Sequence, residues 1–328
     1  MSTLLSVRGL TQHFRLGGLL RKGYTVHAVD DISFDLKQGE TLGLVGESGC
    51  GKSTLGRTLL KLFEPSGGTI TFEGRDITRL SPREMRSLRQ EMQMVFQDPA
   101  ESLNSRHTVG QILEEPFIIH GKGCTQERRI WVDELLAKVG LPTSARDRYP
   151  HEFSGGQRQR IGIARAIALC PKLLICDEAV SALDVSVQSQ IINLLLTLQR
   201  EMQLAIIFIA HDLSVVKHIS DRIAVMYLGR IVELADAQSL YLAPRHPYTQ
   251  ALISAIPVPD PRRRSQRILL TGDVPSPITP PAGCHFHPRC PHATAHCKNV
   301  APTLEGKDEI SHLVACHLPL ATPEPEQG

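Results

Sequence analysis

The sequence predicts an α/β fold, with a mostly parallel core sheet in the main part of the chain and a small, loop-rich segment at its C-terminal end. Up to about Ala255, short β-branched runs alternate with longer stretches of helical periodicity, which is the pattern of parallel strands joined by crossover helices. From Pro257 to Pro291 the sequence holds nine of its 22 prolines, and proline disfavours long helices because it fixes φ and lacks an N–H. We therefore expect a main domain over residues 1–255 and a smaller one over 256–328.

Composition and charge exclude several classes of protein. The 328 residues are enough for about two domains, and 36 basic against 34 acidic residues do not give the basic surface of a dedicated nucleic-acid binder. A hydrophobic content of 41% excludes a disordered or collagen-like chain. No apolar run approaches the roughly 18 residues of a membrane-spanning helix, and the N-terminus does not have the pattern of a signal peptide. We expect a cytosolic protein that reaches a membrane only through partners.

The first candidate site is a glycine-rich loop between a strand and a helix. Residues 41–45 form a short apolar strand, residues 46–54 read GESGCGKST, and a helical stretch follows through Leu62. This matches G-x-x-x-x-G-K-[ST] in the strand–loop–helix context of phosphate-binding loops, in which backbone N–H groups and the helix dipole converge on an anion. We expect Lys52 to reach the β- and γ-phosphates of a bound nucleotide and Ser53 to ligate Mg²⁺. The predicted nucleotide-binding residues of this loop are Gly46, Glu47, Ser48, Gly49, Cys50, Gly51, Lys52, Ser53 and Thr54.

Two further apolar strands end in polar residues that suit the same chemistry. Residues 172–176 lead into Asp177 and Glu178, and residues 204–210 lead into His211. Ligands of open parallel sheets gather at the carboxyl ends of the strands. We expect Asp177 to join the Mg²⁺ shell, Glu178 to position or deprotonate the attacking water, and His211 to hydrogen-bond the γ-phosphate or that water. Taken singly, each of these residues could be an ordinary helix cap.

A third motif lies between the phosphate loop and the strand that ends at Asp177 and Glu178. Residues 153–160 read FSGGQRQR and lead into a helix, for which Ser154 is also a good N-cap. Together these motifs resemble the nucleotide-binding subunit of ATP-binding-cassette (ABC) transporters over about residues 4–255. In that family the signature motif closes over the γ-phosphate of ATP held by the opposite subunit, so the active site is complete only in a dimer. The matching residues here are Ser154, Gly155, Gly156 and Gln157.

The resemblance implies a P-loop NTPase cassette with an antiparallel β subdomain and a helical signature subdomain over roughly residues 98–170. It assigns Gln97 to the loop that senses Mg²⁺ and the nucleophilic water, and His211 to the switch histidine. The D-loop matches Ser181, Ala182, Leu183 and Asp184. The implied catalytic residues are Glu178, His211, Gln97 and Lys52, and the implied Mg²⁺ ligands are Ser53, Gln97 and Asp177.

Two positions are less well matched to the family. The aromatic residue that stacks on adenine is expected at Phe14; Tyr24 is the alternative, because residues 17–22 look like an insertion, and Phe14 could also be an ordinary core residue. Ala179 stands where the family usually has proline after the glutamate. Since Asp177 and Glu178 are both present, we expect ATPase activity to survive this change.

The C-terminal part indicates a branch of the family. The motif HPYTQAL at 246–252 and the proline- and cysteine-rich tail resemble the dipeptide/oligopeptide importers, and GESGCG at 46–51 looks close to the second ATPase of dipeptide importers. The resemblance implies a peripheral subunit on the cytoplasmic face of the inner membrane, partnered by a second ABC ATPase, two membrane permeases and a periplasmic solute-binding protein. The resemblance also implies that residues 98–116 form the groove for the permeases' coupling helices, and an ordinary solvated loop is the alternative. Antimicrobial peptides, glutathione and nickel are alternative cargoes in this branch.

The four cysteines of the tail form a separate candidate site. Cys284, Cys290, Cys297 and Cys316 lack the C-x-x-C spacing of zinc ribbons, and a cytosolic setting disfavours disulfides. Four thiolates suit iron–sulfur or zinc chemistry, and some members of the peptide-importer branch hold a [4Fe–4S] cluster in a similar tail. We expect a [4Fe–4S] cluster, with Zn²⁺ or unliganded thiols as alternatives. The other cysteines, Cys50, Cys124, Cys170 and Cys176, are expected to be small buried groups.

Three other functions are compatible with parts of the pattern. A DNA-repair or chromosome-organising ABC ATPase would need a long coiled-coil insertion between the phosphate loop and the signature, and only about a hundred residues separate Thr54 from Ser154. An ABC translation factor would carry two cassettes in one chain. A non-catalytic regulatory subunit would not need Lys52, Glu178 and His211 together.

Overall fold

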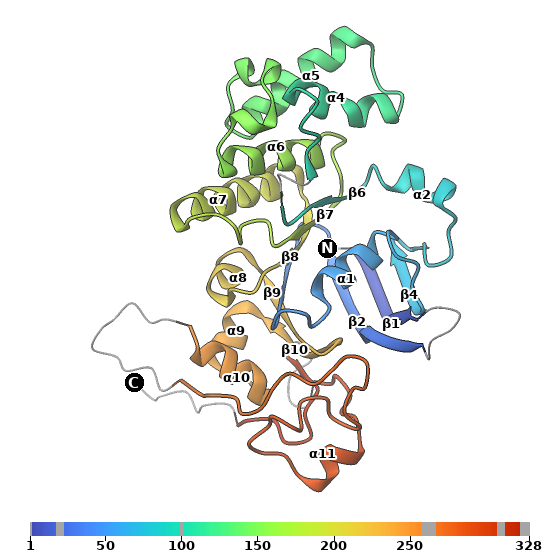
Figure 1. The fold of residues 1–328 in the computed structure, drawn as a ribbon, viewed down its shortest axis with the longest axis vertical. Coiled ribbons are helices and arrows are strands. Elements are labelled where there is room, and N and C mark those ends of the chain that lie inside the picture. Colours follow the sequence, from blue (N-terminus) through green and yellow to red (C-terminus); the bar gives the residue numbers. More distant parts are fainter. Residues whose placement is uncertain (1, 18–22, 99–101, 257–266, 307–311, 322–328) are drawn as a thin grey trace, which may run out of the picture. The chain divides into compact units, whose positions relative to one another are not determined.

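The computed structural model describes residues 2–17, 23–98, 102–256, 267–306 and 312–321 (Figure 1). The chain divides into two compact units: unit 1 comprises residues 1–2, 37–40 and 79–210, and unit 2 comprises residues 3–36, 41–78 and 211–328. Each unit is built from segments that are distant in the sequence. No helix among the described residues combines the length and the apolar character needed to cross a membrane.

Unit 1 contains three parallel strands in the order β8–β7–β6, which are Ala205–Ile209, Leu173–Asp177 and Met92–Val95. Leu173 pairs with Ala205 on one side and with Met92 on the other. Every residue of β7 and β8 is buried. Parallel strands covered on both faces read as continuous apolar runs rather than alternating ones, which is why the two apolar stretches of the sequence predicted these strands correctly.

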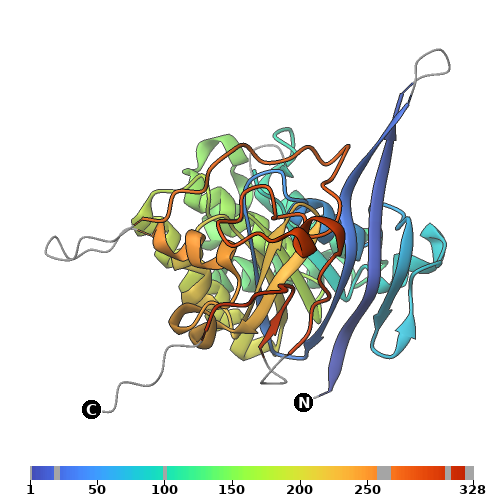
Figure 2. The ribbon, with the colours of Figure 1, turned by 90° about the horizontal axis from the view of Figure 1, so that it is seen from below.

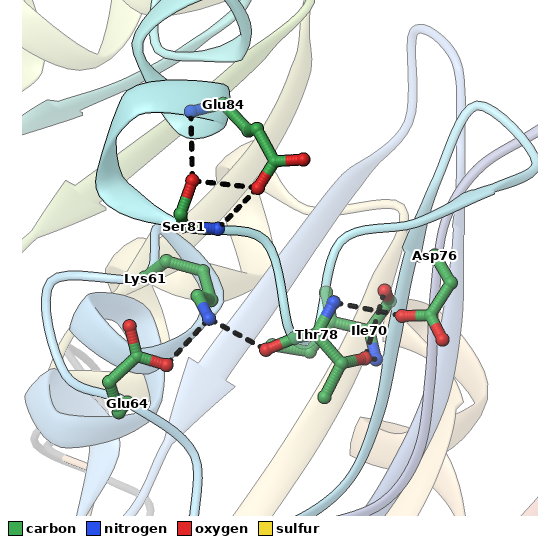
Figure 3. A network of polar contacts seen from close by, with 7 residues as sticks. All are labelled: Lys61, Glu64, Ile70, Asp76, Thr78, Ser81 and Glu84. Atoms are coloured by element: carbon green, nitrogen blue, oxygen red, sulfur yellow. Dashed lines mark hydrogen bonds and ion pairs between the residues drawn. The ribbon is translucent and has the colours of Figure 1, made fainter.

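The helices of unit 1 begin at residues that satisfy their free N–H groups. They are α2 (Pro82–Leu88), α4 (Val109–Ile119), α5 (Thr125–Lys138), α6 (Gly155–Ile167) and α7 (Val185–Met202), with short 3₁₀ turns η1 (Thr143–Asp147) and η2 (Pro150–Glu152). Capping boxes start α2 at Ser81 and Glu84 (Figure 3), α4 at Thr108 and α6 at Ser154. In Figure 1, α4, α5 and α6 lie next to one another, and α6 also packs on β6.

Unit 2 contains an antiparallel sheet in the order β2–β1–β4–β5. Its strands are β1 (Thr3–Leu16), β2 (Tyr24–Lys37), β4 (Gly67–Phe72) and β5 (Arg75–Asp76). Leu5 and Val7 of β1 pair with Phe72 and Ile70 of β4, and all four are fully or almost fully buried. Figure 2 shows β1 and β2 running side by side as a long ribbon. The predicted antiparallel β subdomain is present here.

The second group of strands in unit 2 has the order β11–β10–β9–β3. They are β11 (Leu313–Val314), β10 (Arg230–Asp236), β9 (Arg222–Tyr227) and β3 (Thr41–Val45). β3 and β9 are parallel, whereas β10 pairs antiparallel with β9 and with β11 of the tail. The helices are α1 (Lys52–Leu59), α8 (Leu213–Ile219), α9 (Ala237–Leu242), α10 (Pro247–Ser254) and α11 (Ala295–Asn299). The tail therefore adds a strand to the sheet that carries β3.

A buried lysine fixes the segment after α1 to the antiparallel sheet (Figure 3). Lys61 Nζ donates to the carbonyl oxygen of Thr78 and to the Glu64 carboxylate, both at 2.6 Å. Thr78 in turn accepts the Ile70 N–H on its hydroxyl at 2.8 Å and donates its own N–H to Asp76. Paired in this way, the buried ammonium avoids the desolvation cost of an isolated charge.

The cysteine prediction is correct for two residues of the main domain and wrong for two. Cys50 and Cys176 are buried, but Cys124 and Cys170 are exposed. Cys124 occupies the N-cap position of α5, and Cys170 follows α6 in a left-handed conformation with φ 53°. Both lie at helix ends, and helix ends are commonly on the surface because their unpaired backbone groups need partners or water.

Candidate functional site

The phosphate loop of unit 2 connects β3 to α1 and has no room for side chains at two of its glycines. Gly51 has φ 105°, and a Cβ atom there would lie 2.0 Å from the carbonyl oxygen of Ala28. A Cβ at Gly46 would lie 2.1 Å from the carbonyl oxygen of Met226. The sequence needs glycine at both positions because the loop passes directly against neighbouring backbone.

Lys52 lies at the centre of this loop. Its side chain is buried, and Nζ donates to the carbonyl oxygens of Gly46 at 2.7 Å and Glu47 at 3.0 Å. Gly51 is the N-cap of α1 and makes no side-chain hydrogen bond to the first turn. The N–H groups and the dipole at the start of a helix favour an anion. Ser53 and Thr54 stand in that turn and are half-buried. Burial raises the pKa of the Cys50 thiol.

Glu47 of the loop is held by Arg289 and Tyr248, two residues that the sequence analysis did not assign to this site. Its carboxylate accepts two hydrogen bonds from Arg289 of the tail, at 2.7 and 3.1 Å, and its N–H donates to the Tyr248 hydroxyl at 3.0 Å. Ser48 and Gly49, which follow it, are exposed. The side chain of Glu47 therefore faces protein groups, while the exposed tip of the loop faces solvent.

The two candidates for adenine stacking differ in their surroundings. Phe14 is half-buried at the end of β1, with its ring edge-on to Phe63 at 5.2 Å between centroids. Tyr24, at the start of β2, is 47% exposed. Residues 18–22, the core of the suspected insertion between them, lie outside the described residues. The assignment of the stacking residue stays a prediction.

Unit 1 carries the acidic residues at the end of β7. Asp177 is fully buried. Glu178 follows in a left-handed conformation with φ 48°, which is rare for a residue with a side chain and is concentrated at functional sites. Its N–H donates to the carbonyl oxygen of Ile209 in β8 at 3.0 Å. The change of backbone conformation between the two residues turns Glu178 out of the strand.

Gln97 contacts Glu178 directly. The amide Nε2 of Gln97 donates to Oε2 of Glu178 at 2.9 Å. Gln97 follows β6 and is exposed, and Glu178 is half-buried. The contact brings together two residues that the sequence placed in one site although 81 positions separate them.

A cavity next to this contact gathers the other motifs of unit 1. It is lined by Gln97, Asp98, Gly155, Arg158, Gln159, Ala179, Ala182 and Leu183. The segments that the sequence assigned to the Q-loop, the signature and the D-loop therefore meet around one space. Ala179 is buried in its wall, at the position where the family usually has proline.

The signature segment forms the first turn of α6. Ser154 Oγ accepts the Gln157 N–H at 3.3 Å, and Gln157 Oε1 accepts the Ser154 N–H at 3.0 Å, while both side chains are exposed. Gly156 packs against α7, because a Cβ there would lie 2.4 Å from Val187 Cγ1. The capping box holds Ser154 in a fixed orientation at the surface.

The D-loop is tied to the residues around it. Ser181 donates its N–H and its hydroxyl to the carbonyl oxygen of Glu178, at 3.1 and 3.0 Å. Asp184 caps α7, and Gln188 reaches back to the carbonyl oxygens of Val180 and Leu183. Ala182 and Asp184 are exposed. In unit 2, His211 is exposed directly before Asp212, the N-cap of α8.

The four tail cysteines line one pocket of unit 2. Cys284, Cys290, Cys297 and Cys316 share it with Phe286 and Leu318, and with His246, His287, His292 and His317. Burial raises the pKa of Cys284, Cys290 and Cys316, the last to about 11. Cys284 and Cys297 are also joined through backbone, because the Cys284 N–H donates to the Cys297 carbonyl oxygen at 2.8 Å. Four cysteines separated by up to 32 positions in the sequence thus line the same pocket.

Within the described ranges of the chain, a further group could hold a cation by the nature of its side chains. Ligand atoms of His13, His27 and Asp30 lie within 4.8 Å of one another. Arg230 donates two hydrogen bonds to Oδ2 of Asp30, at 2.9 and 2.7 Å. A fixed guanidinium in this position repels a second cation, so we attribute the group to an ion pair between β2 and β10.

Comparison with known proteins shows to which family the chain belongs. It is 55% identical to the oligopeptide transport ATP-binding protein AppF of Bacillus subtilis over 321 residues, which cover 96% of this chain and 97% of AppF. The chain belongs to the ATP-binding proteins of ABC transporters. The family described as ABC transporter matches residues 29–181, and the family described as the C-terminal region of oligopeptide/dipeptide transporters matches residues 232–297. The resemblance to this branch is therefore confirmed.

A further relative and two solved structures support the same family assignment. The probable peptide ABC transporter ATP-binding protein y4tS of Sinorhizobium fredii is 53% identical over 317 residues, with 96% of this chain and 90% of y4tS covered. The dimeric cassette MJ0796 bound to ADP and Pi is 26% identical with a TM-score of 0.65, covering 71% of this chain and 99% of MJ0796. CbiO1 of Clostridium perfringens is 30% identical with a TM-score of 0.63, covering 74% of this chain and 91% of CbiO1. The predicted cassette fold is confirmed, and this ABC protein is an ATPase.

Proposed function

We propose that this ABC ATPase drives the import of di- and oligopeptides. The observation that carries the proposal is the 55% identity to an oligopeptide transport ATP-binding protein along nearly the whole chain, tail included. Residues 1–255 would be the nucleotide-binding domain, with its helical subdomain over roughly 98–170, and residues 256–328 would be a C-terminal domain of the peptide-importer type. Transport of another solute, such as an antimicrobial peptide, glutathione or nickel, is the alternative.

The phosphate loop would bind the triphosphate of ATP. Backbone N–H groups at the start of α1 would face the phosphates, and Lys52 would neutralise charge on the β- and γ-phosphates. Ser53, Gln97 and Asp177 would hold Mg²⁺, since hydroxyl, amide and carboxylate oxygens are the hard ligands that this ion prefers. The ion supplies charge neutralisation at the phosphates. Phe14 would stack on the adenine.

Glu178 would act on the attacking water, and Gln97 would hold its carboxylate. The 2.9 Å hydrogen bond from Gln97 Nε2 to Oε2 of Glu178 would orient this carboxylate toward the water. His211 would donate to the γ-phosphate oxygen, where negative charge is stabilised in the transition state. Catalysis would thus consist mainly of positioning and charge stabilisation.

The exposed signature residues would complete the site of a partner. Ser154, Gly155, Gly156 and Gln157 would contact the γ-phosphate held by a second ABC ATPase, with the D-loop (181–184) beside them. Two ATP molecules would close the dimer, and hydrolysis would reopen it. The exposure of Ser154 and its fixed orientation support this role.

Membrane partners would convert this closure into transport. The chain would lie peripherally on the cytoplasmic face of the inner membrane, bound to two permeases through the groove at residues 98–116, with a periplasmic solute-binding protein delivering the cargo. Residues 99–101 of that groove lie outside the described residues. Its described part includes the beginning of α4.

Reconstitution tests this function. The chain would be co-purified with its partner ATPase and permeases, placed in liposomes with the solute-binding protein, and supplied with ATP. We expect uptake of labelled di- or oligopeptides that stops when Glu178→Gln replaces the wild type. Uptake of nickel, glutathione or an antimicrobial peptide without uptake of short peptides would support the alternative cargo. ATP hydrolysis unlinked to any uptake would contradict a transport role.

We also propose that the four tail cysteines hold a [4Fe–4S] cluster. The donor set fits, because four thiols line one mainly apolar pocket and soft sulfur ligands select iron–sulfur centres or zinc. Cys284, Cys290, Cys297 and Cys316 would be the ligands. The cluster would supply a metal–thiolate centre that links distant parts of the tail. Zn²⁺ held by cysteines and nearby histidines is the alternative.

Metal analysis distinguishes these occupants. Protein purified without oxygen would be assayed for iron, acid-labile sulfide and zinc, together with the visible absorbance of an iron–sulfur cluster. We expect about four irons per chain in the wild type and their loss in Cys290→Ser, with Cys170→Ser as the control at an exposed thiol outside the tail. Stoichiometric zinc would favour the alternative, and absence of both metals would contradict the proposal.

A further inference from the structure

In the described part of the C-terminal tail, Arg289 forms an ion pair with Glu47 of the phosphate loop. From this contact we infer that Arg289 is a positioning residue: it holds the loop in its ATP-binding shape and so sets the affinity of the subunit for ATP. The inference rests on the proposed binding of ATP by this loop. It gives the tail a function in the nucleotide site in addition to any metal that the tail holds.

The ion pair has the geometry of a strong contact. Arg289 Nη1 lies 2.7 Å from Glu47 Oε2 and Nη2 lies 3.1 Å from Oε1, so the guanidinium grips both carboxylate oxygens. The Arg289 side chain is only 8% exposed and that of Glu47 is 28% exposed. Hydrogen bonding to Glu47 raises the pKa of Arg289. Removing one partner would leave a poorly solvated charge, which is the costly way to break such a pair.

Arg289 itself is held by a cluster of aromatic rings. The ring of Phe286 lies 5.2 Å from that of Tyr227 and 5.4 Å from that of Tyr248, between centroids. The Arg289 N–H donates to the Phe286 carbonyl oxygen at 3.0 Å, and the guanidinium carbon lies 5.9 Å from the Tyr227 ring centroid. Because the three rings that surround it are buried, Arg289 is well placed to fix the position of Glu47.

The loop depends on such external contacts. Gly46, Gly49 and Gly51 all have positive φ values, and glycine has the widest conformational freedom of any residue. Among the described residues, contacts that hold the loop from outside include the Arg289 pair, the Tyr248 hydroxyl on the Glu47 N–H, and the Gly229 N–H on the Cys50 carbonyl oxygen at 2.9 Å. The first two of these are made to Glu47.

Glu47 is also connected to the lysine of the site. Its carbonyl oxygen accepts a hydrogen bond from Lys52 Nζ at 3.0 Å. A shift of Glu47 would therefore move both the loop backbone and the lysine that is proposed to reach the phosphates. Both bind the phosphates before the reaction begins, so we expect the effect mainly on ATP affinity and KM, with a smaller effect on kcat.

The experiment measures ATP affinity in the assembled transporter. All variants would be made in the Glu178→Gln background, so that ATP stays intact during equilibrium binding, and KM and kcat would be measured in the matching complexes with Glu178 restored. Arg289→Gln and Glu47→Gln are each expected to raise the Kd for ATP about tenfold, which corresponds to about 1.4 kcal/mol. If the two residues act as a pair, the double variant binds ATP about as weakly as either single variant.

Two further variants separate positioning from a loss of folding. Arg8 also donates two hydrogen bonds to an aspartate of the same unit, Asp35. Removal of this pair in Arg8→Gln should leave the Kd for ATP unchanged. Arg289→Lys keeps the charge but not the two-pronged grip, and should give an intermediate Kd even if Arg289→Gln fails to fold.

The outcomes are distinct. An unchanged Kd in Arg289→Gln and Arg289→Lys, fully additive effects of Arg289 and Glu47, or an equal loss in Arg8→Gln would each overturn the inference while the proposed function stands. A fall in kcat with KM unchanged would also overturn it. Failure of the parent Glu178→Gln complex to bind ATP would overturn both the inference and the proposed ATP site.

Discussion

Gln97 and Glu178 share a hydrogen bond of 2.9 Å, from the amide Nε2 to Oε2 of the carboxylate. Glu178 reaches this position because its backbone adopts φ 48° immediately after a buried strand. An amide donor fixes the rotation of the carboxylate without changing its charge. The pair therefore holds the carboxylate of Glu178 in a defined orientation, which the first prediction tests.

Replacing Glu178 by glutamine should separate ATP binding from hydrolysis. The amide keeps the size of the side chain but cannot accept a proton from water, so turnover in the assembled transporter should fall about 10²–10⁴-fold. ATP should still bind, because the phosphate loop is unchanged, and the dimer should stay closed. ATPase rates and size-exclusion chromatography with ATP would measure both effects.

The control for this variant is Glu201→Gln, an identical chemical change at an exposed position of α7. It should leave turnover unchanged. Full turnover in Glu178→Gln would remove Glu178 from the proposed role, and the base would then have to be sought elsewhere.

Ser154 is the N-cap of α6 and has a proposed second role at the ATP of a partner subunit, and a pair of substitutions can separate the two. Ser154→Ala removes the N-cap of α6 and should lower the free energy of unfolding by about 1 kcal/mol. Ser154→Asp keeps a capping oxygen and should leave stability near that of the wild type, but its charge would face the γ-phosphate of the partner's ATP. Like charges brought together cost several kcal/mol, so ATPase activity of the transporter should fall at least about tenfold.

Urea unfolding and ATPase assays on the same two variants give the answer. If Ser154→Asp is as active as the wild type, Ser154 serves only as a helix cap. If both variants lose stability equally, the capping oxygen seen here is not what starts α6.

Local signals in the sequence predicted much of the site, but they did not predict contacts between residues that are distant in the sequence. The strand at 41–45, the glycine-rich loop and the Ser154 cap depend on neighbours in the sequence, and each is found as predicted. The Arg289–Glu47 pair joins residues 242 positions apart, and β11 joins the tail to β10. Neither has a local pattern, because both depend on how the chain packs after its elements have formed.

Gly51→Ala should disrupt the loop more than an equivalent change elsewhere. A methyl group at Gly51 would meet the Ala28 carbonyl oxygen at 2.0 Å, in addition to the strain of φ 105°. Gly74→Ala is the matched control, because its φ is 77° but no atom lies within 4 Å of the new Cβ. In the control, the free energy of unfolding should fall only by the conformational cost of a left-handed residue with a side chain, about 1–2 kcal/mol. Urea unfolding measures this change.

Nucleotide binding distinguishes the two glycine variants further. Gly51→Ala should lose ATP binding in equilibrium titrations, whereas Gly74→Ala should bind ATP as the wild type does. Equal stability and equal ATP affinity in the two variants would mean that the loop can move away from Ala28 at no cost.

Because of the ion pair between Asp30 and Arg230, the free energy of unfolding should fall as the pH is lowered into the acid range. Burial alone would raise the pKa of Asp30. The hydrogen bonds and charge of Arg230 act in the opposite direction, and the net pKa lies below its usual value of 3.8. A carboxyl whose pKa is depressed in the folded state stabilises the protein above the pKa of the unfolded chain, and this contribution is lost as pH falls below about 3.8 through the folded value. At neutral pH, Asp30→Asn should therefore lower the free energy of unfolding by about 1.5–3 kcal/mol, the range for hydrogen bonds to charged groups.

The difference between the wild type and Asp30→Asn should shrink as the pH is lowered from 7 to below 3.8, because protonated Asp30 loses the same attraction to Arg230 that asparagine lacks. Asp35→Asn is the control: its partner Arg8 is 53% exposed, and Asp35 itself is 44% exposed. Exposed pairs contribute about 0–1 kcal/mol, so its effect should be smaller at every pH. Urea unfolding at a series of pH values measures both. A stability difference for Asp30→Asn that is the same at pH 7 and in acid would show that the charge of Asp30 does not stabilise the fold.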